Sequence, residues 1–418
     1  MESSLTKIFR QKLTNQILCL VLLVSSVLSP LRILPGNNRI DIILMPIAVF
    51  LLIFNNLNLW PNLVKKNRQV LLTLSVFYGW IWICAGFSAY WKTAIKYNVF
   101  YSIYTLIFVF FLLVTLEFKE NKSETIYHRL IFNFLSFLGA IGMIEFFAPD
   151  LWVFDYLGAH NYLNYYPRVS SLMQNPNQFG AIMTIGVIIG IILQKQKLLN
   201  PYEFYIGMFF LFASGALAAS RNGWILFVLF IILGVAYKVI SLKDAVIYSL
   251  VWLFSLLFFP IPTYRLGLTD NPIVPLMQFF ADVELEIPDP TSTAVSRLFI
   301  WKMAIDQTIQ NPLTGIGIGV YAEHIGVEAF GRVGTHAHNM FLSLSAETGI
   351  TGLLIFLGLL GSIIRQTDLK NGSVTIFVIL LFVSQLPDFF IADPTFMIVA
   401  LYLFAIACNS KGEGVAVG

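Results

Sequence analysis

Four polar motifs interrupt the apolar segments of this sequence and contain its best candidates for chemistry. Three motifs carry an arginine, a side chain that stays charged and binds phosphate through two parallel hydrogen bonds. The fourth carries two histidines, whose neutral imidazoles can accept a proton near neutral pH. In chain order the motifs are Arg168-Val-Ser-Ser-Leu-Met-Gln-Asn-Pro-Asn-Gln-Phe-Gly180, Ser220-Arg221-Asn-Gly-Trp224, Ser296-Arg297-Leu-Phe-Ile-Trp301 with Asn311-Pro-Leu-Thr-Gly-Ile-Gly-Ile-Gly319, and Thr335-His-Ala-His-Asn-Met-Phe-Leu342 with Glu347-Thr-Gly-Ile-Thr-Gly352.

Arg221 stands between two strongly apolar segments. A charge so close to hydrocarbon is costly unless it is paired or faces a wet cavity, which favours a functional role. A side chain that extends to the membrane interface is the alternative. The Asn-Pro-Asn turn at 175–177 predicts a helix start at the membrane surface, and a plain helix cap is the favoured explanation of this turn taken alone.

His336 and His338 are two residues apart, but no cysteine or acidic cluster accompanies them at a spacing typical of a metal site. We therefore expect a base and no metal. The glycines at 315, 317 and 319 have the wrong spacing and context for a dinucleotide fingerprint, and no Lys-Ser or Lys-Thr follows to make a phosphate loop. They indicate a flexible turn near the membrane.

Apolar segments make up most of the chain and must position these motifs. Hydrophobic residues fill 57% of the 418 positions and charged residues 12%, with a mean hydropathy of +0.77. Soluble domains carry roughly a quarter charged residues, so this composition excludes an ordinary soluble protein. The segments are continuously apolar, which predicts helices and not a barrel. We predict twelve spanning helices, at about 16–34, 39–59, 70–90, 98–116, 129–148, 178–194, 202–219, 222–240, 243–260, 338–363, 373–391 and 394–410.

Charge predicts the orientation of these helices. With the N-terminus in the cytoplasm, sixteen of the 26 lysines and arginines fall on the inner side and ten on the outer side. This excess agrees with the positive-inside rule. The first segment is too long for a signal peptide, so we expect it to remain attached. Both termini are then cytoplasmic, and all four motifs lie on the outer side.

Two long outer loops divide the chain. We expect nine spanning helices and an aromatic outer loop, 149–177, within residues 1–259. Residues 260–337 form a large outer loop, and 338–418 contain three more spanning helices and a short tail. The aromatic residues of the first loop suit an interfacial belt, with stacking on sugar rings as the alternative. They are Trp152, Phe154, Tyr156, Tyr162, Tyr165 and Tyr166.

The large loop contains one clear helix signal. Pro290 and Pro312 bracket a segment without helix breakers, and Ser292 or Thr293 can cap a helix that runs to about Gln310. Asp388 and Asp393, near the outer ends of the last two helices, suit either a cavity or helix caps. The three cysteines lie singly in apolar segments and are expected to be packing residues.

The ordered set of motifs resembles the O-antigen ligase and polymerase superfamily. The resemblance runs from about Arg168 to Gly352 and includes one large outer loop before the last three helices. It implies an all-α integral membrane protein with about twelve transmembrane helices and one large periplasmic loop containing short helices, in the bacterial inner membrane. It also implies an inverting glycosyltransferase that passes an undecaprenyl-diphosphate-linked oligosaccharide to a sugar hydroxyl on the periplasmic face, without a metal or other cofactor.

The resemblance and the chemistry of the residues together imply roles for the motifs. A departing diphosphate gains negative charge, which arginine stabilises. An acceptor hydroxyl is a poor nucleophile until a base withdraws its proton. We therefore expect His338 to be the base and Arg221 and Arg297 to clamp the diphosphate, with Arg168 as a third candidate. The expected acceptor-binding or supporting residues are His336, Asn339 and Glu347.

The acceptor leaves several alternatives open. We expect a polymerase, which uses a lipid-linked repeat unit as acceptor and has a chain-length regulator as a candidate partner. A ligase that transfers the glycan to lipid A core is the close alternative, and transfer to a protein hydroxyl is a third. A transporter of a small anion or sugar is the alternative from another class, although the two halves show no internal repeat. We expect the lipid bilayer as a partner, and no nucleic acid.

Overall fold

The computed structural model of this chain describes residues 4–29, 41–116, 124–151, 154, 161–163, 166–173, 175–258, 293–327, 336–386 and 393–411. Within these ranges the protein is helical, apart from one short hairpin. In the hairpin, β1 (Asn161–Leu163) pairs antiparallel with β2 (Tyr166–Arg168). The helical class predicted from the continuous apolar segments is confirmed.

Each of the twelve predicted apolar segments overlaps a helix of the structure. Five helical segments are long and apolar enough to cross a membrane, by length and composition: Leu57–Phe87, Trp91–Leu116, Ile126–Phe147, Pro176–Lys195 and Met340–Gln366. The full set of twelve crossings stays a prediction. The overlapping helices are α1 (Ser4–Val27), α2 (Asp41–Asn55), α3 (Trp60–Phe87), α4 (Trp91–Leu116), α6 (Glu124–Phe147), α8 (Pro176–Lys195), α9 (Pro201–Leu217), α10 (Arg221–Ala236), α11 (Leu242–Phe258), α16 (Met340–Gln366), α17 (Gly372–Ser384) and α18 (Pro394–Ser410).

Local sequence explains where many of these helices begin. A polar side chain directly before the helix accepts a hydrogen bond from a backbone N–H of the first turn, which those N–H groups otherwise lack. Proline follows the cap in three helices, where its missing N–H costs nothing. The capping residues are Asn175, Asn200, Ser220, Asn339, Asn371 and Asp393.

Several boundaries differ clearly from the prediction. α1 begins at Ser4 in place of the predicted 16, and α4 begins at Trp91 in place of the predicted 98. α3 begins at Trp60, ahead of the predicted start at 70, because the helix continues through the lysine-rich stretch that apolar periodicity excluded; non-helical angles at Asn67 mark a kink there. α17 ends at Ser384, before the predicted end at 391. The early end places the last turn of α17 at the candidate site described below.

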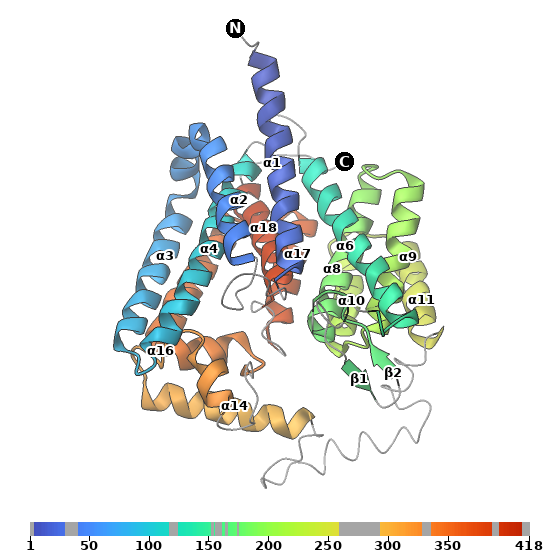
Figure 1. The fold of residues 1–418 in the computed structure, drawn as a ribbon. Coiled ribbons are helices and arrows are strands. Elements are labelled where there is room, and N and C mark those ends of the chain that lie inside the picture. The colour runs from blue at the N-terminus through green and yellow to red at the C-terminus, as the bar shows by residue number, and fades with distance from the viewer. Residues whose placement is uncertain are drawn as a thin grey trace.

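The helices form two packed groups joined by α17 (Figure 1). In one group α6 packs on α8 and α9, α8 packs on α9 and α10, and α11 packs on α9 and α10. In the other group α16 packs on α3, while α18 packs on α4 and α1 on α2. α17 contacts α10 on one side and α18 on the other. One large hydrophobic core runs through both groups.

The hairpin and a further helix, α14 (Thr293–Gln310), lie at the end of the molecule opposite both termini (Figure 1). The helix predicted from Ser292 or Thr293 to about Gln310 is confirmed. α14 lies across this end and packs against α16. Two short turns complete the described elements: η1 (Leu57–Leu59) and η2 (Tyr321–Ile325). The three cysteines are buried and free, as expected of packing residues.

Candidate active site

The C-terminal end of α17 joins two of the predicted motifs. Asn222, which follows the first residue of α10, donates from Nδ2 to the carbonyl oxygen of Ser384 at 3.1 Å. The backbone N–H of Met340, at the start of α16, donates to the carbonyl oxygen of Gln385 at 3.1 Å. The last carbonyls of a helix have no partner within that helix. Here they hold the start of α10 and the start of α16 at one junction.

Asn339 fixes the backbone beside the candidate base His338. Its Oδ1 accepts from the backbone N–H groups of Phe341 at 3.0 Å and Leu342 at 3.1 Å, which caps α16. Its Nδ2 donates to the carbonyl oxygen of Leu386 at 3.0 Å. His338 has φ of 48°, a left-handed conformation that costs free energy and persists only where its surroundings enforce it. The bonds of Asn339 provide that enforcement.

Arg168 and Arg221 lie close enough for their charges to interact. Nε and Nη2 of Arg168 donate to the carbonyl oxygen of Ala218 at 3.2 and 3.1 Å, and Nη2 donates to Oδ1 of Asn177 at 2.9 Å. Burial first, and the charge of Arg221 second, lower the pKa of Arg168 to about 10. Arg221 is exposed at the first position of α10. Two cations beside a helix N-terminus favour a bound anion at this place.

The Asn-Pro-Asn turn and the Ser-Arg motif are bonded to each other. Ser220 Oγ donates to the carbonyl oxygen of Asn177 at 3.1 Å and accepts from the backbone N–H of Gly223 at 3.3 Å. Asn175 caps α8 by accepting from the backbone N–H of Asn177 at 2.9 Å. The expected cap is therefore present. The same turn also binds Arg168, so the cap and a positioning role coexist.

Glu145 supports Arg168 from α6, and sequence reasoning missed it. Its Oε2 accepts from the backbone N–H groups of Ser170 at 2.9 Å and Ser171 at 2.6 Å. The carboxylate is 5% exposed, and Ser171 has φ of 52°. A charged acceptor with two amide donors fixes this tight turn directly after Arg168. The only local signal was an acidic residue inside an apolar segment.

Glu347, predicted to support the site, lies buried between two glycine-bearing segments. Its Oε1 accepts from the backbone N–H of Tyr321 at 3.2 Å. The backbone N–H of Gly317 donates to the carbonyl oxygen of Glu347 at 2.9 Å, and that of Ile350 donates to the carbonyl oxygen of Pro312 at 2.8 Å. The glycine-rich turn is therefore bonded to α16, in contrast to the flexible turn that the sequence suggested.

Glycine at positions 315 and 349 is required by this close approach. Gly349 has φ of 70° and ψ of 176° within α16, a conformation open almost only to glycine. A Cβ on it would lie 2.2 Å from the carbonyl oxygen of Leu313. A Cβ on Gly315 would lie 2.4 Å from the backbone of Glu347. The two motifs are thus one structural unit, which bends α16 beneath the junction.

Three polar atoms near the junction have no hydrogen-bond partner among the described residues. They are Asn222 Oδ1, Ser343 Oγ and Gln385 Oε1, from the starts of α10 and α16 and the end of α17. All three residues are buried. Buried polar atoms are nearly always bonded to protein, water or ligand. Their gathering here fits a site that receives water or substrate.

The structure locates two further predicted site residues, Arg297 and His336, in the chain. Arg297 lies in the helical backbone of α14, but its side chain is outside the described residues. His336 is half-buried, two residues before His338. Among the described part of the chain, no group of three or more His, Cys, Asp or Glu could hold a metal ion.

The remaining sequence candidates have structural contacts or fall outside the described residues. Phe154 is buried in the core and so is not available for stacking on a sugar; the side chains of the other five loop aromatics lie outside the described residues. Asp393 caps α18 by accepting from the backbone N–H of Phe396 at 2.8 Å, whereas Asp388 lies outside. His324 bonds Thr93 at 3.0 Å and stacks on Tyr90.

Residues 206–357 match the family model described as O-antigen ligase. The match includes Arg221, His338 and the interlocking glycine motifs, and it excludes Arg168. The resemblance to the O-antigen ligase and polymerase superfamily is therefore confirmed.

Two curated proteins are similar to this chain. The ComP-specific O-oligosaccharyltransferase of Acinetobacter baylyi is 26% identical over 292 residues, which is 66% of this chain and 50% of that protein. The exopolysaccharide production protein ExoQ of Rhizobium meliloti is 33% identical over 73 residues, or 15% of this chain and 17% of that protein. The aligned part of this chain thus spans about half of the first relative and a smaller share of the second.

Proposed function

We propose that this chain, a membrane glycan transferase of the O-antigen ligase and polymerase superfamily, moves an oligosaccharide from undecaprenyl diphosphate to an acceptor hydroxyl. The meeting of the arginine motif and the histidine motif at the end of α17 carries the proposal. Cations suit the leaving diphosphate and imidazole suits the acceptor proton. The site thus contains both kinds of group that the transfer needs.

The transfer proceeds in one displacement. The acceptor oxygen forms a bond to the anomeric carbon, and the bond from that carbon to the diphosphate oxygen breaks with inversion. The acceptor proton passes to His338, and the diphosphate leaves with the electron pair. Arg221 and Arg168 stabilise its growing charge, with Arg297 as a further ligand. No metal is required by this scheme.

The acceptor that we propose first is a lipid-linked repeat unit, which makes the protein a polymerase of a surface polysaccharide. The similarity to an exopolysaccharide production protein supports this choice. Transfer to a protein hydroxyl is the second candidate, because the longer alignment is to a ComP-specific O-oligosaccharyltransferase. A ligase acting on lipid A core uses the same donor chemistry. Both relatives are named for glycan transfer or production, which favours an enzyme over the small-anion or sugar transporter.

We also propose the membrane topology that the charges predict. Twelve helices cross the inner membrane, both termini are cytoplasmic, and residues 260–337 form a large periplasmic loop. The hairpin and α14 lie opposite both termini, which supports this arrangement (Figure 1). A periplasm-dependent reporter fused near Gly326 should be active. Activity of a cytoplasmic reporter at that position would reject the topology.

The first test uses purified full-length protein in detergent with an undecaprenyl-diphosphate oligosaccharide as sole substrate and a chelator present. We expect a ladder of multiples on a gel, and no ladder from His338→Ala. His324→Ala is the matched control, because it removes a histidine that bonds Thr93 away from the junction. Arg221→Lys should also be damaging, because lysine lacks the two-pronged geometry of arginine. Full activity of His338→Ala would remove the base assignment.

The acceptor is identified by the same assay with added components. If no ladder forms, lipid A core and a pilin-type protein are supplied separately. Product on lipid A core identifies a ligase, and product on the protein identifies a protein oligosaccharyltransferase. A wild-type protein that transfers to none of the acceptors, yet moves a small anion or sugar across vesicles, would reject the proposed function.

A further inference from the structure

Ser384, the last residue of α17, binds two buried amide side chains. Asn222 donates from Nδ2 to the carbonyl oxygen of Ser384 at 3.1 Å, and Gln385 donates from Nε2 to its Oγ at 3.0 Å. The two side chains belong to residues that are 8% and 5% exposed. Among the described residues, neither Oδ1 of Asn222 nor Oε1 of Gln385 has a hydrogen-bond partner. Each amide therefore uses its donor end and leaves its acceptor end unpaired.

Ser384 fixes the orientation of both amides. The two ends of an amide have nearly the same shape, so the hydrogen-bond network decides which end faces which neighbour. The carbonyl oxygen of Ser384 can only accept, so Asn222 must turn its NH2 group toward it. Ser384 Oγ donates its single hydrogen to the carbonyl oxygen of Leu381 at 2.7 Å, so it can only accept from Gln385. Both amide oxygens consequently point away from Ser384.

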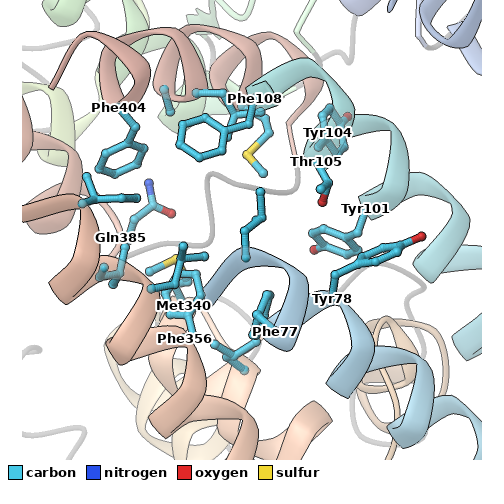
Figure 2. A pocket seen from close by; sticks show the side chains of 18 of the residues that line it. Phe77, Tyr78, Tyr101, Tyr104, Thr105, Phe108, Met340, Phe356, Gln385 and Phe404 are labelled. Carbon is cyan, nitrogen blue, oxygen red and sulfur yellow. The ribbon is translucent and has the colours of Figure 1, made fainter. Parts of the chain in front are cut away.

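The surroundings of Gln385 supply no donor to its amide oxygen. Figure 2 shows this amide among the side chains that line an apolar cavity, near Phe404 and Met340. A phenyl ring and a thioether have no hydrogen to donate. Buried polar atoms are nearly always bonded to protein, water or ligand, because an unpaired one costs free energy. The unpaired oxygens therefore call for a bound molecule that carries hydrogen-bond donors.

We propose that Asn222 and Gln385 are specificity-determining residues that accept hydrogen bonds from the sugar attached to the diphosphate of the donor. The inference rests on the proposed function, because that function places this sugar between the leaving diphosphate and the acceptor. Asn222 directly follows Arg221 in the chain. The carbonyl oxygen of Gln385 accepts from the backbone N–H of Met340, two residues after His338. One amide thus lies beside the diphosphate ligand and the other beside the base.

The chemistry of the two oxygens selects the sugar over the rest of the donor. Diphosphate oxygens are acceptors and repel an amide oxygen, and a prenyl chain has no polar hydrogen. Sugar hydroxyl and acetamido N–H groups are donors. Ser343 Oγ, buried on α16 and also without a partner among the described residues, can donate or accept and adds a third contact. The ligand class is a sugar with hydroxyl or acetamido groups next to its anomeric carbon.

The test compares two probes that differ only in the sugar, with full-length protein in nanodiscs. The probes are undecaprenyl diphosphate and the undecaprenyl-diphosphate oligosaccharide of the transfer assay, and binding is measured before transfer can consume the second. The ratio of the two Kd values reports the contribution of the glycan. We expect Gln385→Leu to lower this ratio by about tenfold and to leave the Kd of undecaprenyl diphosphate unchanged. A wild-type ratio of one, or an unchanged ratio in folded Gln385→Leu, would overturn the proposal.

Gln366→Leu is the matched control, because it makes the same change at the opposite end of α16 from the junction. The Gln366 amide donates to the carbonyl oxygen of Lys66 at 3.5 Å, and its Oε1 also lacks a partner among the described residues. The ratio should keep its wild-type value in this variant. An equal fall in Gln366→Leu and Gln385→Leu would show a general effect of losing a buried amide and overturn the assignment.

Ser384→Ala tests the orientation of Gln385 separately. It removes the Oγ that binds this amide and keeps the carbonyl oxygen that holds Asn222. Because Gln385 can then turn either end toward the sugar, we expect the ratio to fall about threefold. Ser384→Ala should lower the ratio no further when Gln385→Leu is already present. A further fall in the double variant would overturn the orienting role of Ser384.

The subsite and the proposed function fail in different ways, because binding of the probes does not depend on transfer. A glycan-dependent affinity that is lost in Gln385→Leu, in a protein that transfers to no acceptor, would support the subsite and reject the proposed enzyme. A glycan ladder from wild-type protein, together with an unchanged ratio in Gln385→Leu, would support the enzyme and reject the subsite.

Discussion

Asn339→Ala should reduce transfer far more than it reduces stability, because Asn339 both caps α16 and ties it to α17. The substitution removes an acceptor for two backbone N–H groups and a donor to the carbonyl oxygen of Leu386. The candidate base His338 is the preceding residue and has a strained backbone with φ of 48°. Loss of these bonds lets His338 relax to an ordinary conformation.

The expected loss of activity follows from the free energy of the helix cap and of the hydrogen bond to Leu386. Losing an N-cap costs about 1 kcal/mol, and losing the hydrogen bond to Leu386 costs about 1 kcal/mol more. Strain of the kind seen at His338 amounts to about 1–3 kcal/mol. Removing about 2 kcal/mol of support therefore lowers the fraction of protein with His338 in place by up to about 30-fold. We expect a fall in kcat of about tenfold or more, with little change in KM for the donor.

Asn371→Ala is the matched control in this assay. Asn371 caps α17 at its first turn, where its side chain accepts from the backbone N–H of Val374 at 3.3 Å. The substitution removes a helix cap, but Asn371 lies at the opposite end of α17 from the junction. Transfer kinetics and thermal unfolding should be measured for both variants. Similar kcat values for Asn339→Ala and Asn371→Ala, at similar stability, would refute the positioning role.

Three further measurements test the architecture of the site. Gly349→Ala should cost about 3 kcal/mol or more of stability from its strained backbone and the clash with Leu313, whereas Gly361→Ala on the same helix, with open space at its Cβ, should be neutral or stabilising in thermal unfolding. Glu145→Ala should raise KM for the donor and cost about 2–5 kcal/mol, because two backbone N–H groups lose their acceptor; an unchanged KM in folded protein would contradict its support of Arg168. Inorganic diphosphate at a hundredfold its Kd should stabilise the protein by about 2.7 kcal/mol, less in Arg221→Gln. This gain should persist at neutral pH and shrink as pH rises past about 10, where Arg168 loses its proton; a shift independent of pH and of Arg221 would contradict the site.

The helices were predictable because the residues that favour each helix lie next to one another in the sequence. Continuous apolar segments gave the positions of the main helices, and two prolines bracketed α14. Boundaries were less predictable where a helix continues into charged residues, as at the start of α3. Five helices are long and apolar enough to cross a membrane. The twelve predicted crossings stay a prediction.

The candidate site was only partly predictable because its contacts join distant parts of the chain. Motifs identified Arg168, Arg221 and His338 by residue type. The bond between Asn222 and Ser384 joins residues 162 positions apart and has no local signature. Glu145 was missed for the same reason, since its partners are backbone amides beyond the hairpin. The sequence suggested a flexible turn at the glycine motif, whereas Gly315 and Gly349 allow two backbone segments to pack closely, a contact that the spacing of the glycines does not reveal.

The junction at the end of α17 limits how this protein can be recombined with its relatives. The family match ends at residue 357, whereas the carbonyls that hold its two motifs belong to residues 384–386. A chimera that exchanges only the matched segment would combine motifs from one protein with the anchoring helix end of another. A chimera that exchanges the matched segment together with α17 and the turn around Arg168 should preserve the hydrogen bonds at the end of α17. The unit to exchange is thus discontinuous in sequence, and its boundaries lie outside residues 206–357.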